Sequence, residues 1–318
     1  MSTLVQSLRT LRRLRLLAAA GFLLAGGVLA AVAPGASAAA PITVNCSGAD
    51  MQSAIDNAPA GATLQVSGSC SGSYTINQNL TLVGRQGAVI DGQGAGTALT
   101  VSAGATVQVT GFTITGGDGL QGGGVNNSGT LTLTRDTVTN SFGDSGGGVY
   151  NSGSLTLNGT TVSLNDSGGF GGGIYNNGAM TVNSSTVQQN LASDGGGGIF
   201  SCCGFDPVTV INSAIRGNDA ASGSGGGVFN LLDNITLINT TVSRNTATLE
   251  AGGIDNNAGT TTLENSTVAN NAVTSGNGGS FGGGIFSFSG TVLLTRSSVL
   301  GNSPDNCEPA GTITGCLG

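Results

Sequence analysis

Three aspartates are the residues of this chain whose types and spacing could support chemistry. Asp206 and Asp233 each precede a repeated aliphatic position by nine residues, which places them in neighbouring copies of a sequence repeat, and Asp255 follows in the next copy. Carboxylates about 5 Å apart could cleave a glycosidic bond as a retaining pair or hold a calcium ion. The chain contains no His and no Lys to act as a base, so this pattern favours binding over catalysis.

Aromatic residues recur at one position of the repeat, directly after the repeated aliphatic residue. In four consecutive copies they are Tyr150, Tyr175, Phe200 and Phe229. Alternation along a strand puts this position opposite the buried aliphatic residue, so we expect the rings either to face outward or to fold over the neighbouring turn. Outward rings suit sugar rings or a partner protein, which makes these four residues the candidate ligand-binding site.

Acidic residues precede most glycine runs, about once in each copy of the repeat. They are Asp118, Asp144, Asp166, Asp194, Asp219 and Glu250. One acid per copy could line a row of calcium ions, although the Gly-Gly-x-Gly-x-Asp calcium nonapeptide does not recur here. The favoured interpretation is that these acids keep the molecule soluble and prevent stacking between molecules. No metal site or cofactor is therefore assigned, and calcium stays the open alternative.

Six cysteines in an exported chain predict disulfides. Proximity favours the pairs Cys46–Cys70 and Cys307–Cys316. Cys202 and Cys203 are adjacent, so they form either a vicinal disulfide or two free thiols. A metal role is not expected, because the chain has no His and no C-x-x-C spacing.

The elements that must position these residues are copies of one repeat. Each copy starts with a glycine run that ends in an aliphatic residue, and the spacing between copies is 24 to 31 residues. The aliphatic residues are Val125, Val149, Ile174, Ile199, Val228, Ile254 and Ile285. Segments of alternating apolar and polar residues follow each run, which is typical of strands with one buried face. A period of this length indicates a solenoid, and we expect three short strands in each coil.

Asparagines recur at two other positions of the repeat. One column is Asn127, Asn151, Asn176, Asn230 and Asn256, and the other is Asn165, Asn190, Asn218, Asn245, Asn271 and Asn302. Asn tolerates turn geometry, and its amide can bond both to the backbone and to the Asn of the next coil. We therefore expect two structural ladders at the corners of the coils.

The repeat combines two motifs, a glycine run followed by Val or Ile, an aromatic residue and Asn, and a V-x-x-N ending. This combination resembles two groups of known sequences. One group is the polymorphic outer-membrane-protein repeats, with their paired GGA-[ILV] and F-x-x-N signatures. The other is the secreted bacterial right-handed β-helix proteins of the pectate-lyase-like superfold. The resemblance covers about residues 122–302 and implies an all-β fold, a right-handed single-stranded parallel β-helix.

The same resemblance implies two functions. The first is a non-catalytic, adhesin-like scaffold that binds an extracellular glycan or a cell-surface partner. The alternative is a polysaccharide lyase or glycoside hydrolase, for which Asp206, Asp233 and Asp255 are the catalytic candidates. The lack of a His or Lys base favours the first.

Residues 1–38 have the pattern of an export signal. Four arginines precede an apolar run, and Ala36-Ser37-Ala38 fits the small-residue cleavage rule. The run is shorter than a spanning helix, so we expect no transmembrane segment in the mature chain, which would be secreted and free or associated with the cell surface. The formal charge of −7 and the lack of a basic stripe disfavour nucleic acid as a partner.

Three further segments follow the signal. Residues 39–62 are expected to form an N-terminal cap, in which a short helix places Met51 and Ile55 over the first coil. Residues 63–302 are expected to form the parallel β-helix, and residues 303–318 a C-terminal cap or polar tail. No second globular domain is predicted.

Overall fold

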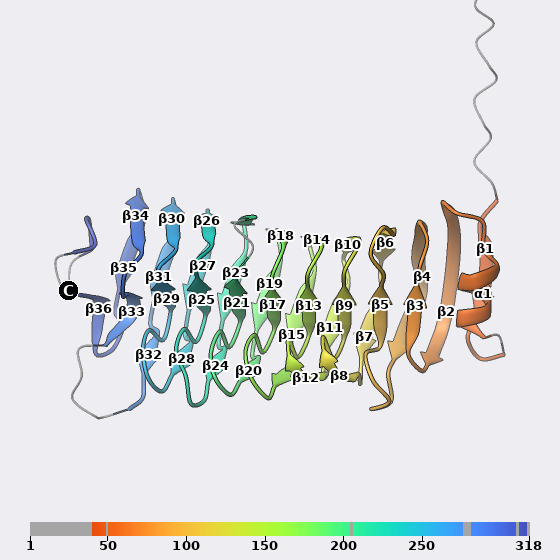
Figure 1. Cartoon of the computed structure of the whole chain (residues 1–318), viewed down its shortest axis with the longest axis horizontal. Coiled ribbons are helices and arrows are strands. Elements are labelled where there is room, and N and C mark those ends of the chain that lie inside the picture. Colours follow the sequence, from red (N-terminus) through yellow and green to blue (C-terminus); the bar gives the residue numbers. More distant parts are fainter. Residues whose placement is uncertain (1–39, 49, 204–205, 276–280, 310–311, 317–318) are drawn as a thin grey trace, which may run out of the picture. The chain divides into compact units, whose positions relative to one another are not determined.

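The structure is a computed structural model that describes residues 40–48, 50–203, 206–275, 281–309 and 312–316. These residues belong to one unit, a solenoid in which short parallel strands stack side by side along the long axis (Figure 1). The predicted all-β parallel β-helix with an N-terminal helix is confirmed. The expected export signal lies outside the described residues.

The strands form three sheets. The 19-stranded sheet contains β1 (Ile42–Asn45), β2 (Ala62–Ser71), β4 (Leu80–Asp91), β6 (Thr106–Thr110), β7 (Thr113–Thr115), β10 (Thr130–Thr134), β11 (Thr137–Thr139), β14 (Ser154–Asn158), β15 (Thr161–Ser163), β18 (Ala179–Asn183), β19 (Thr186–Gln188), β22 (Pro207–Ile211), β23 (Ala214–Arg216), β26 (Asn234–Ile238), β27 (Thr241–Ser243), β30 (Thr260–Glu264), β31 (Thr267–Ala269), β34 (Thr291–Thr295) and β35 (Ser298–Leu300). The 10-stranded sheet contains β3 (Tyr74–Ile76), β5 (Leu99–Val101), β9 (Val125–Asn127), β13 (Val149–Asn151), β17 (Ile174–Asn176), β21 (Ile199–Cys202), β25 (Val228–Leu231), β29 (Ile254–Asn257), β33 (Gly282–Ser287) and β36 (Asp305–Glu308). The 7-stranded sheet contains β8 (Asp118–Gln121), β12 (Phe142–Ser145), β16 (Asp166–Ser167), β20 (Leu191–Ala192), β24 (Asp219–Ala220), β28 (Thr246–Ala247) and β32 (Ala272–Val273).

A regular coil has four strands, so the expected three per coil is wrong. In one such coil β13, β14, β15 and β16 follow one another. The 19-stranded sheet receives two of them, separated by a corner residue with positive φ, such as Arg135 (55°), Gly159 (58°) or Ser184 (49°). The fourth strand is only two residues long in five of the coils, and so short a segment carries too little alternation to be recognised in the sequence.

Aliphatic columns fill the interior. Val138, Val162, Val187 and Ile215 are paired in register from coil to coil, and all four are fully buried. Because every coil places an aliphatic residue at the same point, each coil covers the apolar face of the next, as a solenoid requires.

The asparagine ladders are confirmed. Asn190 Nδ2 donates to Asn218 Oδ1 at 2.9 Å and to the Val162 carbonyl at 3.1 Å, and Asn218 repeats the pattern toward Asn245. In the second ladder, Asn127 Nδ2 donates to Asn151 Oδ1 at 2.7 Å. These residues are buried, so each amide satisfies polar groups of two adjoining coils where water cannot reach them.

Each end of the solenoid carries a terminal segment with its own disulfide. Helix α1 (Met51–Asn57) buries Met51 and Ile55 as expected, and Asp50 caps it by accepting a hydrogen bond from the Gln52 N–H. The segment expected to be only a cap also supplies β1, which pairs with β2 and is joined to it by Cys46–Cys70. At the other end the expected polar tail supplies β36, and Cys307–Cys316 is present.

Replacing Asn190 with Ala tests the ladder. We expect the free energy of unfolding to fall by on the order of 3 kcal/mol, because the Asn165 N–H and amide and the Val162 carbonyl lose their buried partner. Thermal or chemical unfolding followed by circular dichroism measures the loss. The matched control is Thr186→Ala, which changes a half-buried residue of the preceding strand, β19, and for which a change within about 0.5 kcal/mol is expected. Equal effects of the two changes would contradict the role of the ladder.

Candidate functional site

The candidate binding residues lie in one row on the outer face of the 10-stranded sheet. The pairing register joins the same position of β13, β17, β21, β25, β29 and β33. From coil to coil the row is Tyr150, Tyr175, Phe200, Phe229, Asp255 and Phe286. The residue before each member is a fully or almost fully buried Val or Ile, so alternation directs the row outward.

The rings of this row pack on one another. The Tyr150 and Tyr175 rings are stacked with centroids 5.0 Å apart, Tyr175 and Phe200 are also 5.0 Å apart, and Phe200 meets Phe229 edge to face at 5.3 Å. Phe170, from the loop before β17, covers Phe200 at 4.6 Å, which leaves Phe200 only 3% exposed. Both expected arrangements therefore occur: the row faces outward, and its centre shields the sheet.

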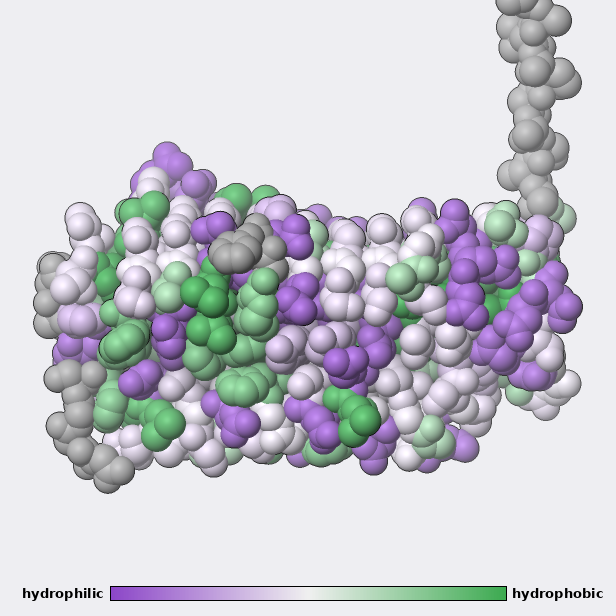
Figure 2. Space-filling model, in the orientation of Figure 1, coloured by the Kyte–Doolittle hydropathy of each residue, from purple (hydrophilic) through white to green (hydrophobic). Residues whose placement is uncertain are grey.

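A glycine allows this cover to form. Phe170, Gly195 and Ser224 hold the same position in successive coils, and a Cβ on Gly195 would lie 2.8 Å from Phe229 Cδ1. With no side chain there, the Phe170 ring also reaches Phe229, at 6.3 Å. Figure 2 shows hydrophobic residues gathered over the part of this face that carries β21 and β25 in Figure 1.

Asp255 is the charged member of the row. Its side chain is only 2% exposed, and its Oδ1 has no hydrogen-bond partner among the described residues. Burial, and to a lesser extent the nearby negative charge of Glu250, raise the pKa of Asp255 from 3.8 to about 8. The pKa of Glu250 is itself raised by burial. Near neutral pH the structure thus holds a protonated carboxyl group beside a second carboxyl, between two phenylalanine positions.

This acid pair could donate and accept a proton. A carboxyl group kept neutral by its surroundings can donate a hydrogen bond, and two acids in different surroundings can act as acid and base. The sequence pointed to Asp255 and named Glu250 only as one of the acids before the glycine runs, and it missed the pairing of these two acids and the role of Phe170. The signal was available, since both residues lie four positions before the repeated aliphatic residue, Ile254 and Ile174 respectively.

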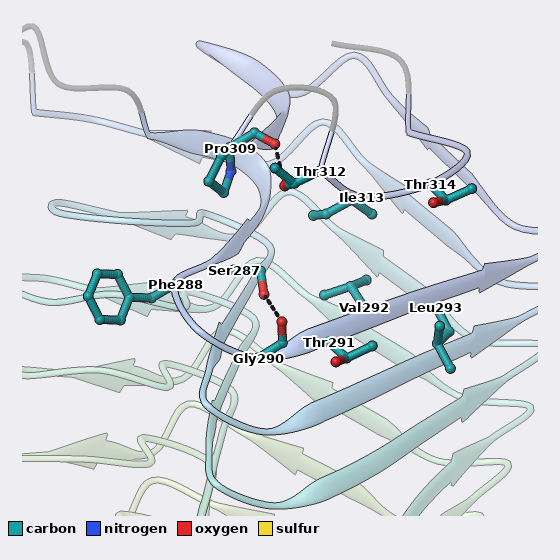
Figure 3. Close-up of a pocket in the computed structure, with 10 residues that line it drawn as sticks. All are labelled: Ser287, Phe288, Gly290, Thr291, Val292, Leu293, Pro309, Thr312, Ile313 and Thr314. Carbon is teal, nitrogen blue, oxygen red and sulfur yellow. Dashed lines mark hydrogen bonds between the residues drawn. The ribbon is translucent and has the colours of Figure 1, made fainter.

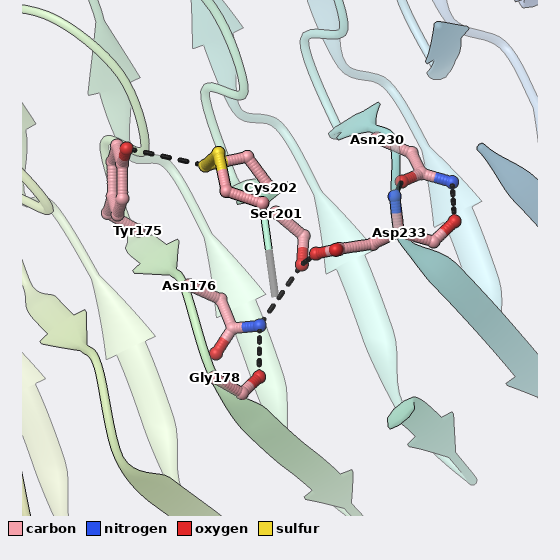
Figure 4. The surroundings of a disulfide bond; sticks show 8 residues. Tyr175, Asn176, Gly178, Ser201, Cys202, Asn230 and Asp233 are labelled. Carbon is pink, nitrogen blue, oxygen red and sulfur yellow. Dashed lines mark hydrogen bonds between the residues drawn. A yellow bond between two sulfur atoms is a disulfide. The ribbon is translucent and has the colours of Figure 1, made fainter. Parts of the chain in front are cut away.

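Asp206 and Asp233 have different surroundings, and the structure does not present them as an outward pair. Asp233 is 1% exposed, and its Oδ2 accepts a hydrogen bond from Ser201 Oγ at 2.7 Å (Figure 4). Ser201 stands where other coils have a ladder asparagine, and it also accepts from Asn176 at 3.1 Å. Asp233 thus extends the buried ladder, whereas Asp206 is exposed.

The adjacent cysteines Cys202 and Cys203 are bonded to each other in the structure. Cys202 is buried and Cys203 is exposed. The Tyr175 hydroxyl lies 3.4 Å from Cys202 Sγ, so the vicinal disulfide adjoins the aromatic row (Figure 4). With this pair, all six cysteines are bonded, and the predicted disulfides are present.

The acids before the glycine runs do not line up in consecutive coils. In the 7-stranded sheet Asp118 pairs with Phe142, Phe142 with Asp166, Asp166 with Leu191, and Leu191 with Asp219. Carboxylates on this row are therefore two coils apart, roughly 10 Å, which is too far for two of them to share a calcium ion. Among the described residues, no three of His, Cys, Asp and Glu gather in one place.

A cavity of about 350 Å³ lies between the last coil and the C-terminal segment (Figure 3). Its lining includes Phe288, Val292 and Ile313 together with serine and threonine side chains, and none of its described lining residues is charged. Among these described residues none is titratable, so the cavity offers apolar contact and hydroxyl hydrogen bonds but no acid–base group.

No protein-family model matches the chain, and no curated protein matches its sequence. Among solved structures, the crystal structure of pectate lyase Pel9A is similar, with a TM-score of 0.52 and 16% sequence identity, covering 83% of this chain and 80% of that chain. The chain therefore has the pectate-lyase-like parallel β-helix fold. At this identity the likeness defines the fold, and the function must be argued from the site. No helix among the described residues is long and apolar enough to span a membrane.

The buried carboxyl of Asp255 predicts a pH effect on stability. Because its pKa is higher in the folded protein, unfolding releases its proton between about pH 4 and pH 8, and the stability that is present below pH 4 is lost over that range. Asp255→Asn removes this loss, so the melting temperature of the variant should rise relative to that of the wild type as the pH rises to 8.

The matched control is Asp144→Asn, which changes an exposed aspartate of β12. Melting temperatures at pH 4.5, 6 and 8, measured at one scan rate for all three proteins, give the comparison. A difference between Asp255→Asn and the wild type that stays constant with pH would show that Asp255 titrates as an ordinary carboxyl group.

Proposed function

We propose that this chain is an extracellular β-helix that binds a polysaccharide along the outer row of its 10-stranded sheet. The observation that carries the proposal is the unbroken run of four aromatic residues in register, Tyr150, Tyr175, Phe200 and Phe229, on the outer face. Export, suggested by residues 1–38, and the absence of a His or Lys base fit a binding role outside the cell.

The packing of the rings decides how a glycan would be held. Since the rings stack on one another, a ligand meets their edges and the tyrosine hydroxyl of Tyr150, rather than open ring faces. Coils lie about 4.8 Å apart, so the four rings span roughly 15 Å along the solenoid. Phe170 covers Phe200, so an elongated chain of sugars would place its C–H groups against Tyr150, Tyr175, Phe229 and the ring of Phe170, and its hydroxyls against the polar residues beside them.

The class of ligand has independent support from the structural neighbour. Pectate lyase, by its name, acts on a polysaccharide, and it has the same fold. That likeness makes a polysaccharide the first class of ligand to test, without naming which one.

A second candidate function is cleavage of the bound glycan. The specific observation in its favour is the pair of Asp255 and Glu250, because a carboxyl group with a pKa near 8 is protonated at neutral pH and could serve as a general acid. Incubation with neutral and acidic polysaccharides, followed by assay of new reducing ends, tests it. Activity that is lost in Asp255→Asn would support an enzyme, and no activity on any substrate would leave the binding function.

Changing Tyr150 to Ala tests the binding row. Tyr150 is half-buried at the N-terminal end of the rings, so we expect an intact fold and an affinity about fivefold to tenfold lower for any polysaccharide that the wild type binds on a glycan array. Phe142→Ala, which removes an exposed ring from the 7-stranded sheet, is the control and should keep the affinity. A Tyr150→Ala protein that binds as the wild type does would remove the row as the site.

Changing Phe200 to Ala should behave differently from Tyr150→Ala. Phe200 is covered by Phe170, so its loss should lower the free energy of unfolding by about 2–4 kcal/mol. Chemical unfolding of both variants measures this contrast. A Phe200→Ala protein as stable as Tyr150→Ala would show that the centre of the row does not support the sheet.

A further inference from the structure

A second surface of the solenoid carries unpaired positive charge. The body of the chain, after residue 38, has five arginines against 16 acids, and two of these arginines, Arg216 and Arg244, line one cavity. The cavity has a volume of about 400 Å³, and its other lining residues are Gln188, Gln189 and Gly217. In so acidic a molecule, two arginines that line one cavity indicate a candidate binding site for an anionic group.

The repeat places these side chains together. Gln188 of β19 pairs with Arg216 of β23, which pairs with Ser243 of β27, so Arg244 follows directly in the next coil. Gln189, Gly217 and Arg244 occupy the same corner of three successive coils, with φ values of 54°, 62° and 56°. The site therefore lies where the 19-stranded sheet turns toward the 7-stranded sheet, away from the aromatic row.

Gly217 opens the cavity. A Cβ built on it would lie 3.8 Å from Gln189 Cγ, and no other heavy atom outside its immediate neighbours comes within 4 Å. The middle of the three corner positions is thus empty of side chain, with an amide on one side and a guanidinium on the other. A small oxyanion fits such a gap.

Neither guanidinium is neutralised by the described part of the chain. Arg216 Nε donates to Gln188 Oε1 at 3.0 Å, which leaves its two terminal nitrogens without a bond, and Arg244 makes no side-chain bond. Asp219, the acid nearest in sequence, accepts a hydrogen bond from Thr246 Oγ1. Guanidinium groups present paired N–H donors that match the two oxygens of a carboxylate or sulfate.

An apolar residue adjoins the cavity on its N-terminal side. Leu164 is 53% exposed, and its N–H bonds to the carbonyl of Gln189 at 3.1 Å. Its φ is 57°, a left-handed conformation that is costly for leucine. An apolar side chain beside two cations and two amides suits a ligand with both C–H surface and anionic groups, as an acidic sugar has.

From these observations we infer that the cavity formed by Arg216, Arg244, Gln188, Gln189 and Gly217 binds the anionic group of an acidic glycan, a carboxylate or a sulfate ester. This inference does not depend on the aromatic row, because it concerns different residues at another corner of the coil. The two arginines come from adjacent coils, so they either hold one anionic group between them or engage two along a chain parallel to the solenoid.

Titration with charged and neutralised forms of the same glycans tests this site. The probes are oligogalacturonate and its methyl ester, and dextran sulfate and dextran, at low salt. Wild-type protein should bind at least one anionic probe and lose that binding with its neutral counterpart, and the arm that binds identifies carboxylate or sulfate as the ligand group.

Variants locate the binding on the protein. Arg216→Gln and Arg244→Gln should each weaken the affinity about fivefold to tenfold, which is the loss of one charge-assisted hydrogen bond at an exposed site. Arg135→Gln removes the same charge from another corner, and it should change the affinity less than twofold. Circular dichroism of each variant confirms that the fold is kept.

Chemical modification of the unaltered protein gives a second readout. Phenylglyoxal should label Arg216 and Arg244, and the bound anionic glycan should protect both from labelling while Arg135 stays reactive. Three results would overturn the inference: no binding of either anionic probe, equal loss of affinity in Arg135→Gln, or full affinity in the double variant of Arg216 and Arg244.

Discussion

Hydrogen bonding from one coil to the next through buried side-chain amides is the interaction on which this structure depends. Most ladder asparagines donate to the asparagine of the next coil and to a backbone carbonyl, as Asn190 does toward Asn218 and Val162. A buried polar group without a partner costs as much as a lost hydrogen bond. A coil that lacks a ladder asparagine therefore needs another hydrogen-bonding side chain at that place. The ladders therefore hold the coils in one register and keep their corners at the same place.

One coil of the interior lacks the ladder asparagine. At Ser201 the side chain is too short to span two coils, and Asp233 fills the gap by accepting a hydrogen bond from the serine hydroxyl. The aspartate that looked like a catalytic candidate is thus a part of the frame. Asp233 is tolerated there because it has hydrogen-bond partners, whereas Asp255 on the outer face has an oxygen without a partner among the described residues, and burial raises its pKa.

Because the interior is fixed by stacking, chemistry is confined to the outer faces and corners. The row from Tyr150 to Phe286 and the corner with Arg216 and Arg244 are both built from positions that the ladders and aliphatic columns leave free. A parallel solenoid repeats such positions every coil, which suits a ligand that is itself a linear repeat. Polysaccharide binding is consistent with this geometry at both places.

The sequence by itself determined the repeat, and with it the parallel β-helix and the two asparagine ladders. These follow from spacing, since a residue that recurs once per coil must stack on its equivalents. It also determined two disulfides, because Cys46 and Cys70, like Cys307 and Cys316, are near one another at the ends of the solenoid. Only the tertiary structure decided which outward residues are covered: Phe170 buries Phe200, and Asp255 lies buried beside Glu250. Burial depends on the loop of the neighbouring coil, and repeat spacings of 24 to 31 residues do not reveal which side chain folds over which.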